Sequence, residues 1–255
     1  MDDQVERLVA QTWAKFDGTP KSQRLMIAVS GIPGSGKTTL AAIVVKRLNE
    51  LHHQQSPGLA SDDDIAAFVP MDGYHLSREQ LSAMPDPETA HARRGAAFTF
   101  DAPAFLALIK RLREPLSAES RTLYAPSFDH AVKDPVADDI PIHPSARILV
   151  FEGNYLSLGS GAKEWKEAAE LMDELWFVEV DEAVARKRLV RRHIAAGLAN
   201  NEDEAGRRAD ENDLVNGKEI IKGRLQVHEV VHSREDASWK PESQGLETAV
   251  ANTAP

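Results

Sequence analysis

An eight-residue stretch near the N-terminus has the residue types and spacing needed to hold a chain of phosphates. Residues 31–38 have the sequence GIPGSGKT, which fits the pattern G-x-x-x-x-G-K-[ST] between an apolar run and a helical pattern. Glycines in such a loop let backbone amides converge on phosphate oxygens, while the lysine reaches the terminal phosphates and the hydroxyl ligates Mg²⁺. We therefore predict binding of a nucleoside triphosphate. The predicted contacts are Gly31, Pro33, Gly34, Ser35, Gly36, Lys37, Thr38 and Thr39.

Two acidic residues directly follow apolar runs and could act on the terminal phosphate. A carboxylate at Asp72 could accept the proton of an attacking hydroxyl group and orient it for in-line transfer. Glu152 follows the run at 148–151 and could hold a water molecule bound to magnesium, so we predict Thr38 and Glu152 as the metal site. For both acids the alternative is an ordinary turn or strand end before glycine, where Asp and Glu are common.

A dense basic run, RKRLVRRH at residues 186–193, is a candidate lid over the phosphates. Arg188 and Arg192 are four residues apart, so they share one face of the predicted helix. From a lid over about 186–211, these cations could neutralise the charge of the β- and γ-phosphates in the transition state. Lys37 would act on the terminal phosphates in the same way. A solvated charged face is the alternative explanation of such a run.

The segments between the apolar runs carry cations, aromatic rings and hydrogen-bonding groups without strand or helix periodicity. Such loops more often carry function than packing, so we expect them to bind the second substrate. Tyr74, Tyr124 and Phe128 could stack on a base. The predicted substrate contacts are Asp72, Tyr74, His75, Arg93, Arg94, Tyr124, Phe128, His130, Lys133 and Tyr155.

The elements that must position these residues alternate between strand and helix. Short apolar runs alternate with helical patterns, which predicts a parallel sheet covered on both faces by helices. Ligands of such sheets bind at the carboxyl ends of the strands, where Asp72 and Glu152 fall. The predicted strands are 25–29, 66–71, 147–151, 175–180 and a weaker 227–232, and the predicted helices are 37–51, 102–112, 163–171, 182–196 and 212–225.

The chain has the composition of one α/β domain. We predict a single domain over 1–234, with an amphipathic docking helix in 1–20 and a loosely held tail over 235–255. The absence of cysteine excludes disulfides, thiolate nucleophiles and cysteine zinc sites. A formal net charge of −10 argues against a nucleic-acid-binding surface, and no apolar run is long enough to span a membrane, so we expect a cytoplasmic protein.

Taken in order, these motifs resemble the phosphoribulokinase, uridine kinase and pantothenate kinase group of P-loop kinases over roughly residues 24–233. The resemblance implies a five-stranded parallel sheet, ATP with Mg²⁺, and phosphorylation of a hydroxyl group. It also implies that Asp72 is the base, that Glu152 lies near the metal, and that Arg188 or Arg192 comes from the lid.

The acceptor region departs from any single branch of that group. Phe128 and Lys133 stand where uridine kinases carry Tyr and His, whereas His130 resembles the histidine of pantothenate kinases. Residues 93–101 and 124–134 look most like a branch of nucleoside or sugar kinase-like proteins of fungi and bacteria.

The sequence thus favours an ATP-dependent kinase that acts on a small molecule with a hydroxyl group. A nucleoside is the preferred acceptor. A sugar or a pantothenate-like acceptor is the alternative. A nucleotide-binding regulatory module that has lost transfer is a second hypothesis. A subunit that acts through a partner or as a homodimer is a third.

Overall fold

A five-stranded parallel sheet forms the centre of the computed structural model, which describes residues 1–56 and 64–234. Its strands lie in the order β2-β5-β1-β6-β7. They are β1 (Leu25–Gly31), β2 (Ala66–Pro70), β5 (Ile148–Glu152), β6 (Glu174–Glu179) and β7 (Glu229–His232). Because each of these strands coincides with a predicted apolar run, the predicted parallel sheet is confirmed. Every residue of β1 is buried, as expected for a central strand covered on both faces.

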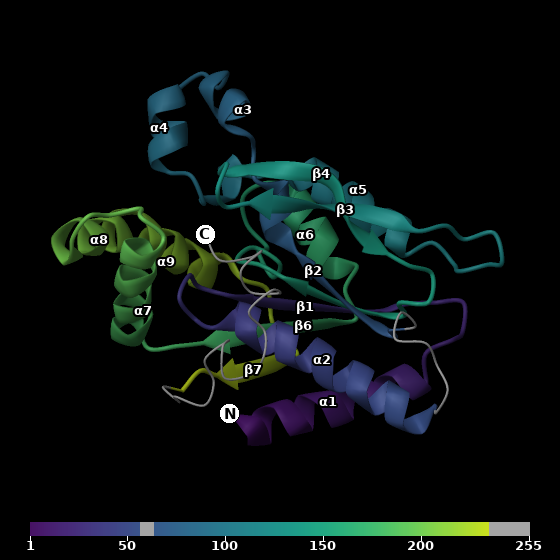
Figure 1. The fold of residues 1–255 in the computed structure, drawn as a ribbon. Helices are drawn as coiled ribbons and strands as arrows, with labels where there is room; N and C mark the ends of the chain where they lie inside the picture. Colours follow the sequence, from purple (N-terminus) through teal and green to yellow (C-terminus); the bar gives the residue numbers. More distant parts are fainter. Residues whose placement is uncertain (57–63, 235–255) are drawn as a thin grey trace.

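Alternate residues of β1 supply two separate cores. Leu25, Ile27 and Val29 pack with α1 (Asp2–Asp17) and α2 (Lys37–Gln55). Met26 and Ala28 point the opposite way, because successive side chains of a strand alternate between faces. That second face is covered by α5 (Ala102–Leu112) and α6 (Lys163–Glu170). Figure 1 shows the sheet between these two helical layers.

A two-stranded arm lies where the sequence predicted only loops. β3 (Leu123–Asp129) and β4 (Asp134–Ile142) pair in antiparallel fashion, so the expectation of no strand there was wrong. The arm carries three prolines and few buried residues, which conceals the alternation that would otherwise identify strands. It packs on a 3₁₀ turn, η1 (Met71–Tyr74), that follows β2 and contains Asp72.

The remaining helices lie mostly at one end of the molecule, beyond the carboxyl ends of the strands (Figure 1). They are α3 (Arg78–Ser82), α4 (Pro87–Ala92), the 3₁₀ turn η2 (Ala97–Thr99), α7 (Glu182–Ala195), α8 (Glu202–Arg208), the π-helix η3 (Ala209–Asp213) and α9 (Leu214–Gly223). The predicted tail over 235–255 lies outside the described residues. Within the described ranges, no helix has the length and apolar character needed to cross a membrane.

Gly73 allows the β3–β4 arm to approach the turn that carries Asp72. A Cβ atom at this position would overlap the carbonyl oxygen of Pro126, so any side chain would push the arm away. We expect Gly73→Ala to lower the free energy of unfolding by about 1–3 kcal/mol, the usual range for overpacking. Chemical denaturation measures this change.

Gly18→Ala is the matched control, since Gly18 has φ −85° and a Cβ there would lie 3.6 Å from the nearest atom, the oxygen of Lys15. It should shift the same free energy by less than about 1 kcal/mol. Equal effects of the two substitutions would contradict the close approach at Gly73.

Candidate active site

The loop between β1 and α2 has the backbone of a phosphate cradle. Gly34 and Gly36 have φ values of +80° and +90°, a region that glycine enters without the cost of a Cβ clash. Gly36 is also the N-cap of α2, so the free amides at the start of that helix face the cradle. The hydroxyl of Ser35 is buried with no hydrogen-bond partner among the described residues. The loop therefore presents donors and partial positive charge where an anion would sit.

A buried ion pair lies at the base of this cradle. The Nζ atom of Lys37 is 3.6 Å from Oε1 of Glu152, and these side chains are 12% and 3% exposed. Burial raises the pKa of Glu152 to about 7; the nearby Lys37 opposes this shift, and Asp72 adds to it. Three charged groups thus act on one another at the carboxyl ends of β1, β5 and β2.

The chemistry of these side chains fits Mg²⁺ in company with a nucleotide. Magnesium is usually bound by one or two carboxylates together with substrate phosphates, and it needs no cage made only of protein ligands. No cluster of three or more His, Cys, Asp or Glu residues suited to a metal occurs in the described part of the chain. Thr38 and Glu152 are the residues placed to share such an ion, and the repulsion between Glu152 and Asp72 would fall on binding a cation.

The cradle opens into a cavity of about 590 Å³ that reaches from the phosphate loop to the arm and to α7 and η3. Asp72 lies in its wall with Lys37 and Thr38. Among the predicted site residues, the structure brings together Pro33, Lys37, Thr38, Asp72, His75, Arg94, Phe128, His130, Lys133, Glu152 and Arg192 around this cavity. One space can therefore hold a phosphate chain and a second molecule side by side.

Burial and a backbone contact favour one neutral tautomer of the His75 imidazole. Its Nδ1 donates to the backbone oxygen of Asp72 at 2.8 Å, which leaves the lone pair on Nε2. Burial lowers the pKa of His75, with the charge of Asp72 opposing this. The ring packs against Phe100 and Phe128 at centroid distances of 4.0 and 4.8 Å. His75 thus offers a hydrogen-bond acceptor within an aromatic wall.

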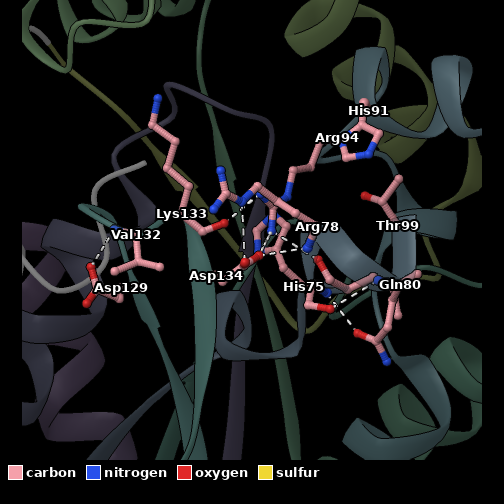
Figure 2. Close-up of polar contacts among 12 residues, drawn as sticks. His75, Arg78, Gln80, His91, Arg94, Thr99, Asp129, Val132, Lys133 and Asp134 are labelled. Carbon is pink, nitrogen blue, oxygen red and sulfur yellow. Dashed lines mark hydrogen bonds and ion pairs between the residues drawn. The ribbon is translucent and has the colours of Figure 1, made fainter. Parts of the chain in front are cut away.

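The turn between β3 and β4 is held in one conformation by polar contacts (Figure 2). The carboxylate of Asp129 accepts the backbone N–H groups of Ala131 and Val132 at 2.8 and 2.9 Å. Arg94 donates to the backbone oxygen of Lys133 at 2.6 Å and to the carboxylate of Asp134 at 3.1 Å. The turn therefore presents its side chains to the cavity from a fixed backbone.

Polar atoms without partners line the same wall. Both ring nitrogens of His130 and the Oδ1 atom of Asn154 are buried and have no hydrogen-bond partner among the described residues. Buried polar atoms are rarely left unpaired, so these groups point to a polar ligand in the cavity. Sequence reasoning missed Asn154, although it directly follows Glu152-Gly153 at a strand end.

The two predicted lid arginines lie in different places. Arg192 lines the cavity; burial lowers its pKa, against the opposing charges of Asp213, Asp72 and Glu152. Arg188 lies on the outer side of the phosphate loop. It donates to the backbone oxygens of Gly34 and Ser35 at 3.2 and 3.3 Å, and it does not line the cavity.

Several other predicted contacts lie outside the cavity wall. Tyr74 and Tyr155 are core residues, and the Tyr155 hydroxyl donates to the backbone oxygen of Gly95 at 2.6 Å. Tyr124 is 50% exposed on β3, and Arg93 contacts η3 and α9. Gly31 ends β1, and Gly34, Ser35, Gly36 and Thr39 belong to the following loop and the first turn of α2; none of the five lines the cavity. The cavity-lining residues that sequence reasoning did not select include Asn154, His193, Arg208, Asn212, Asp213 and Asn216.

Comparisons with known proteins agree with the fold described above. No protein-family model matches the chain. It is 52% identical over 174 residues to the ATP-dependent kinase-like protein notR' of Aspergillus versicolor, covering 68% of this chain and 98% of the relative. It is 44% identical over 194 residues to a Schizosaccharomyces pombe protein whose name proposes a uridine kinase, covering 76% and 77% of the two chains.

Solved structures show the same fold. The crystal structure of YFH7 from Saccharomyces cerevisiae, described as a proposed P-loop kinase with a circular permutation, matches with a TM-score of 0.78 and 25% identity over 91% of this chain and 99% of YFH7. A proposed fructose transport system kinase from Silicibacter sp. TM1040 matches with a TM-score of 0.70 and 32% identity, covering 88% and 98% of the chains.

The raised pKa of Glu152 gives the protein without ligands a distinctive pH dependence. Because burial raises this pKa from 4.5 to about 7, the folded chain keeps a proton that the unfolded chain has lost between those values. The folded state then binds more protons, so the free energy of unfolding should fall as the pH rises from about 5 to 7. Glu152→Gln should remove most of this slope, as measured by chemical denaturation across that range.

Glu50→Gln is the control, because Glu50 is exposed on α2. It should keep the slope of the wild-type protein. An unchanged slope in Glu152→Gln would show that Glu152 does not carry this effect.

Proposed function

The chain belongs to the ATP-dependent P-loop kinases, and from that premise we propose that it transfers the γ-phosphoryl group of ATP to a hydroxyl group of a nucleoside. The supporting observation is a single cavity in which Asp72 lies with the phosphate-loop residues Lys37 and Thr38 and with the aromatic wall of His75 and Phe128. An acceptor bound against that wall would present its hydroxyl group to Asp72 and to the terminal phosphate.

In the proposed step the acceptor oxygen forms a bond to the γ-phosphorus as the bond from that phosphorus to the bridging β–γ oxygen breaks. The acceptor proton passes to the carboxylate of Asp72, and ADP is the leaving group. Lys37 and Arg192 line the cavity and would stabilise negative charge on the transferring group. Magnesium held by Thr38 and Glu152 would neutralise phosphate charge when bound.

A nucleoside is the acceptor class that we propose to test first. The rings of His75 and Phe128 offer stacking surfaces, and the unpaired nitrogens of His130 suit the polar edge of a base or a ribose. A relative named as a proposed uridine kinase supports this choice. Phe128 and Lys133 differ from the Tyr and His of uridine kinases, so sugars and pantothenate-like acids are the second choice.

Replacement of the proposed base should abolish transfer without loss of nucleotide binding. We expect Asp72→Asn to lower kcat by about 10²–10⁴-fold, the usual contribution of a general base. The dissociation constant of a non-hydrolysable ATP analogue, measured by calorimetry, should stay near the wild-type value. Asp138→Asn is the control, since Asp138 is exposed on β4 and lies outside the cavity wall, and asparagine tolerates its φ of +53°. Full turnover in Asp72→Asn would remove Asp72 from this role.

A coupled assay for ADP release identifies the acceptor class. Purine and pyrimidine nucleosides, hexoses and pantothenate should be compared at equal concentrations against ATP alone. We expect a nucleoside to raise ADP release well above the acceptor-free rate. A response only to sugars or to pantothenate would replace the nucleoside by that class. Slow hydrolysis that no acceptor changes would support the regulatory module instead.

A further inference from the structure

Three consecutive residues, 93–95, contact three different segments around the cavity: η3 with α9, the β3–β4 turn, and the segment after β5. Arg94 holds the β3–β4 turn through the backbone oxygen of Lys133 and the carboxylate of Asp134 (Figure 2). The backbone oxygen of Gly95 accepts from the Tyr155 hydroxyl, which anchors the segment beyond β5. Arg93 points to a different partner, the helical segment that closes the end of the cavity.

The contacts of Arg93 are directed and largely shielded from solvent. Its Nε atom donates to Oδ1 of Asn212 at 3.2 Å, and its Nη2 atom donates to Oδ1 of Asn216 at 2.7 Å. Asn212 and Asn216 are only 8% and 2% exposed. Asn212 in turn donates to the backbone oxygen of Arg94 at 3.0 Å, so the asparagine and residues 93–94 hold each other.

From Asn212 the contacts continue to the part of the cavity wall that contains Arg192 and Arg208. The carboxylate of Asp213, the next residue, accepts from Nε2 of His193 at 2.9 Å. His193 follows Arg192 on α7, and both line the cavity with Arg208. Asn212 and Asp213 belong to the π-helix η3, a rare helix type that is frequently found at functional sites.

We propose that Arg93 is a positioning residue that links the β3–β4 turn, which binds the acceptor in the proposed function on which this inference rests, to Arg192 and Arg208. Movement of Arg192 and Arg208 toward bound phosphates would be transmitted through Asp213, Asn212 and Arg93 to Arg94, which holds the turn. Nucleotide binding would thereby order the acceptor side of the cavity. By linkage, acceptor binding would favour the nucleotide-bound position of the lid to the same extent.

Hydrogen exchange of the full-length protein tests this link with Mg²⁺ and AMPPNP as the probe. No acceptor is required, so the outcome is independent of the acceptor class proposed above. In the wild-type protein, the nucleotide should slow amide exchange in the lid and η3, residues 186–213, and in the turn and the first residue of β4, residues 130–134, by about 5-fold or more. In Arg93→Gln the slowing should persist in the lid and shrink to less than about 2-fold in the turn.

Two further variants separate a positioning role from a general loss of stability. Arg186→Gln removes an exposed ion pair between α7 and η3, Arg186 with Asp210, and should retain the response of the turn. Arg93→Lys keeps the charge and one donor group, so it should restore part of that response. If Arg93→Gln does not fold, Asn216→Ala removes the acceptor of the 2.7 Å hydrogen bond from the other side.

The amide-exchange response of the turn in these variants distinguishes the two results. Loss of the turn's response in Arg93→Gln or Asn216→Ala, with the lid's response and the exchange of β1 and β5 unchanged, supports it. A turn that responds equally in Arg93→Gln and in Arg186→Gln overturns it. So does a wild-type turn that does not respond to the nucleotide.

Discussion

The buried pair of Lys37 and Glu152 is the interaction on which the arrangement of the site depends. The sheet order places β1 between β5 and β6, and the register sets Val29 of β1 beside Glu152 of β5. Lys37 starts the helix that follows β1, so its ammonium group falls next to that carboxylate. Burying charges is costly unless each is paired. Here Asp72, just past Pro70 of β2, adds a second carboxylate, and the buried Arg192 acts on both carboxylates together with Lys37. In the proposed function, a phosphate chain and a magnesium ion would bind together among these opposed charges.

The sequence predicts which residues follow the strands of the sheet. It is less informative about the direction in which each of those side chains points. Parallel strands buried on both faces are continuous apolar runs, so the sheet and the residues that follow its strands could be predicted. The turn at Asp72 shows the limit. In a 3₁₀ turn, residues three apart share a side, so Asp72 and His75 both face the cavity while Tyr74 between them packs on Phe105 in the core. Nothing in the spacing of these residues reveals that the chain is 3₁₀ there.

The spacing of Arg188 and Arg192 likewise did not predict that the two side chains reach different parts of the site. Arg188 and Arg192 do share a face of α7, but one helical turn separates them by about 6 Å along the axis. That rise is enough to put Arg188 against the backbone oxygens of the phosphate loop and Arg192 over the cavity. A side chain's role then follows from where α7 docks. Docking is fixed by Gly34, where a Cβ would come within 2.8 Å of the backbone oxygen of Ala185.

The β3–β4 turn is held by other contacts than the residues at the edge of the sheet. This turn is shaped by Asp129, Arg94 and Asp134, none of which belongs to the five-stranded sheet that positions Lys37 and Glu152. Lys133 illustrates the point. It has a φ of +63°, a conformation that costs a residue with a Cβ roughly 1–2 kcal/mol and that glycine adopts freely. Backbone geometry alone therefore favours glycine at this position, where Lys133 lines the cavity. In the proposed function, residues at the sheet edge carry out the phosphate chemistry and the β3–β4 turn binds the second substrate, which is why the sequence identifies the reaction more readily than the acceptor.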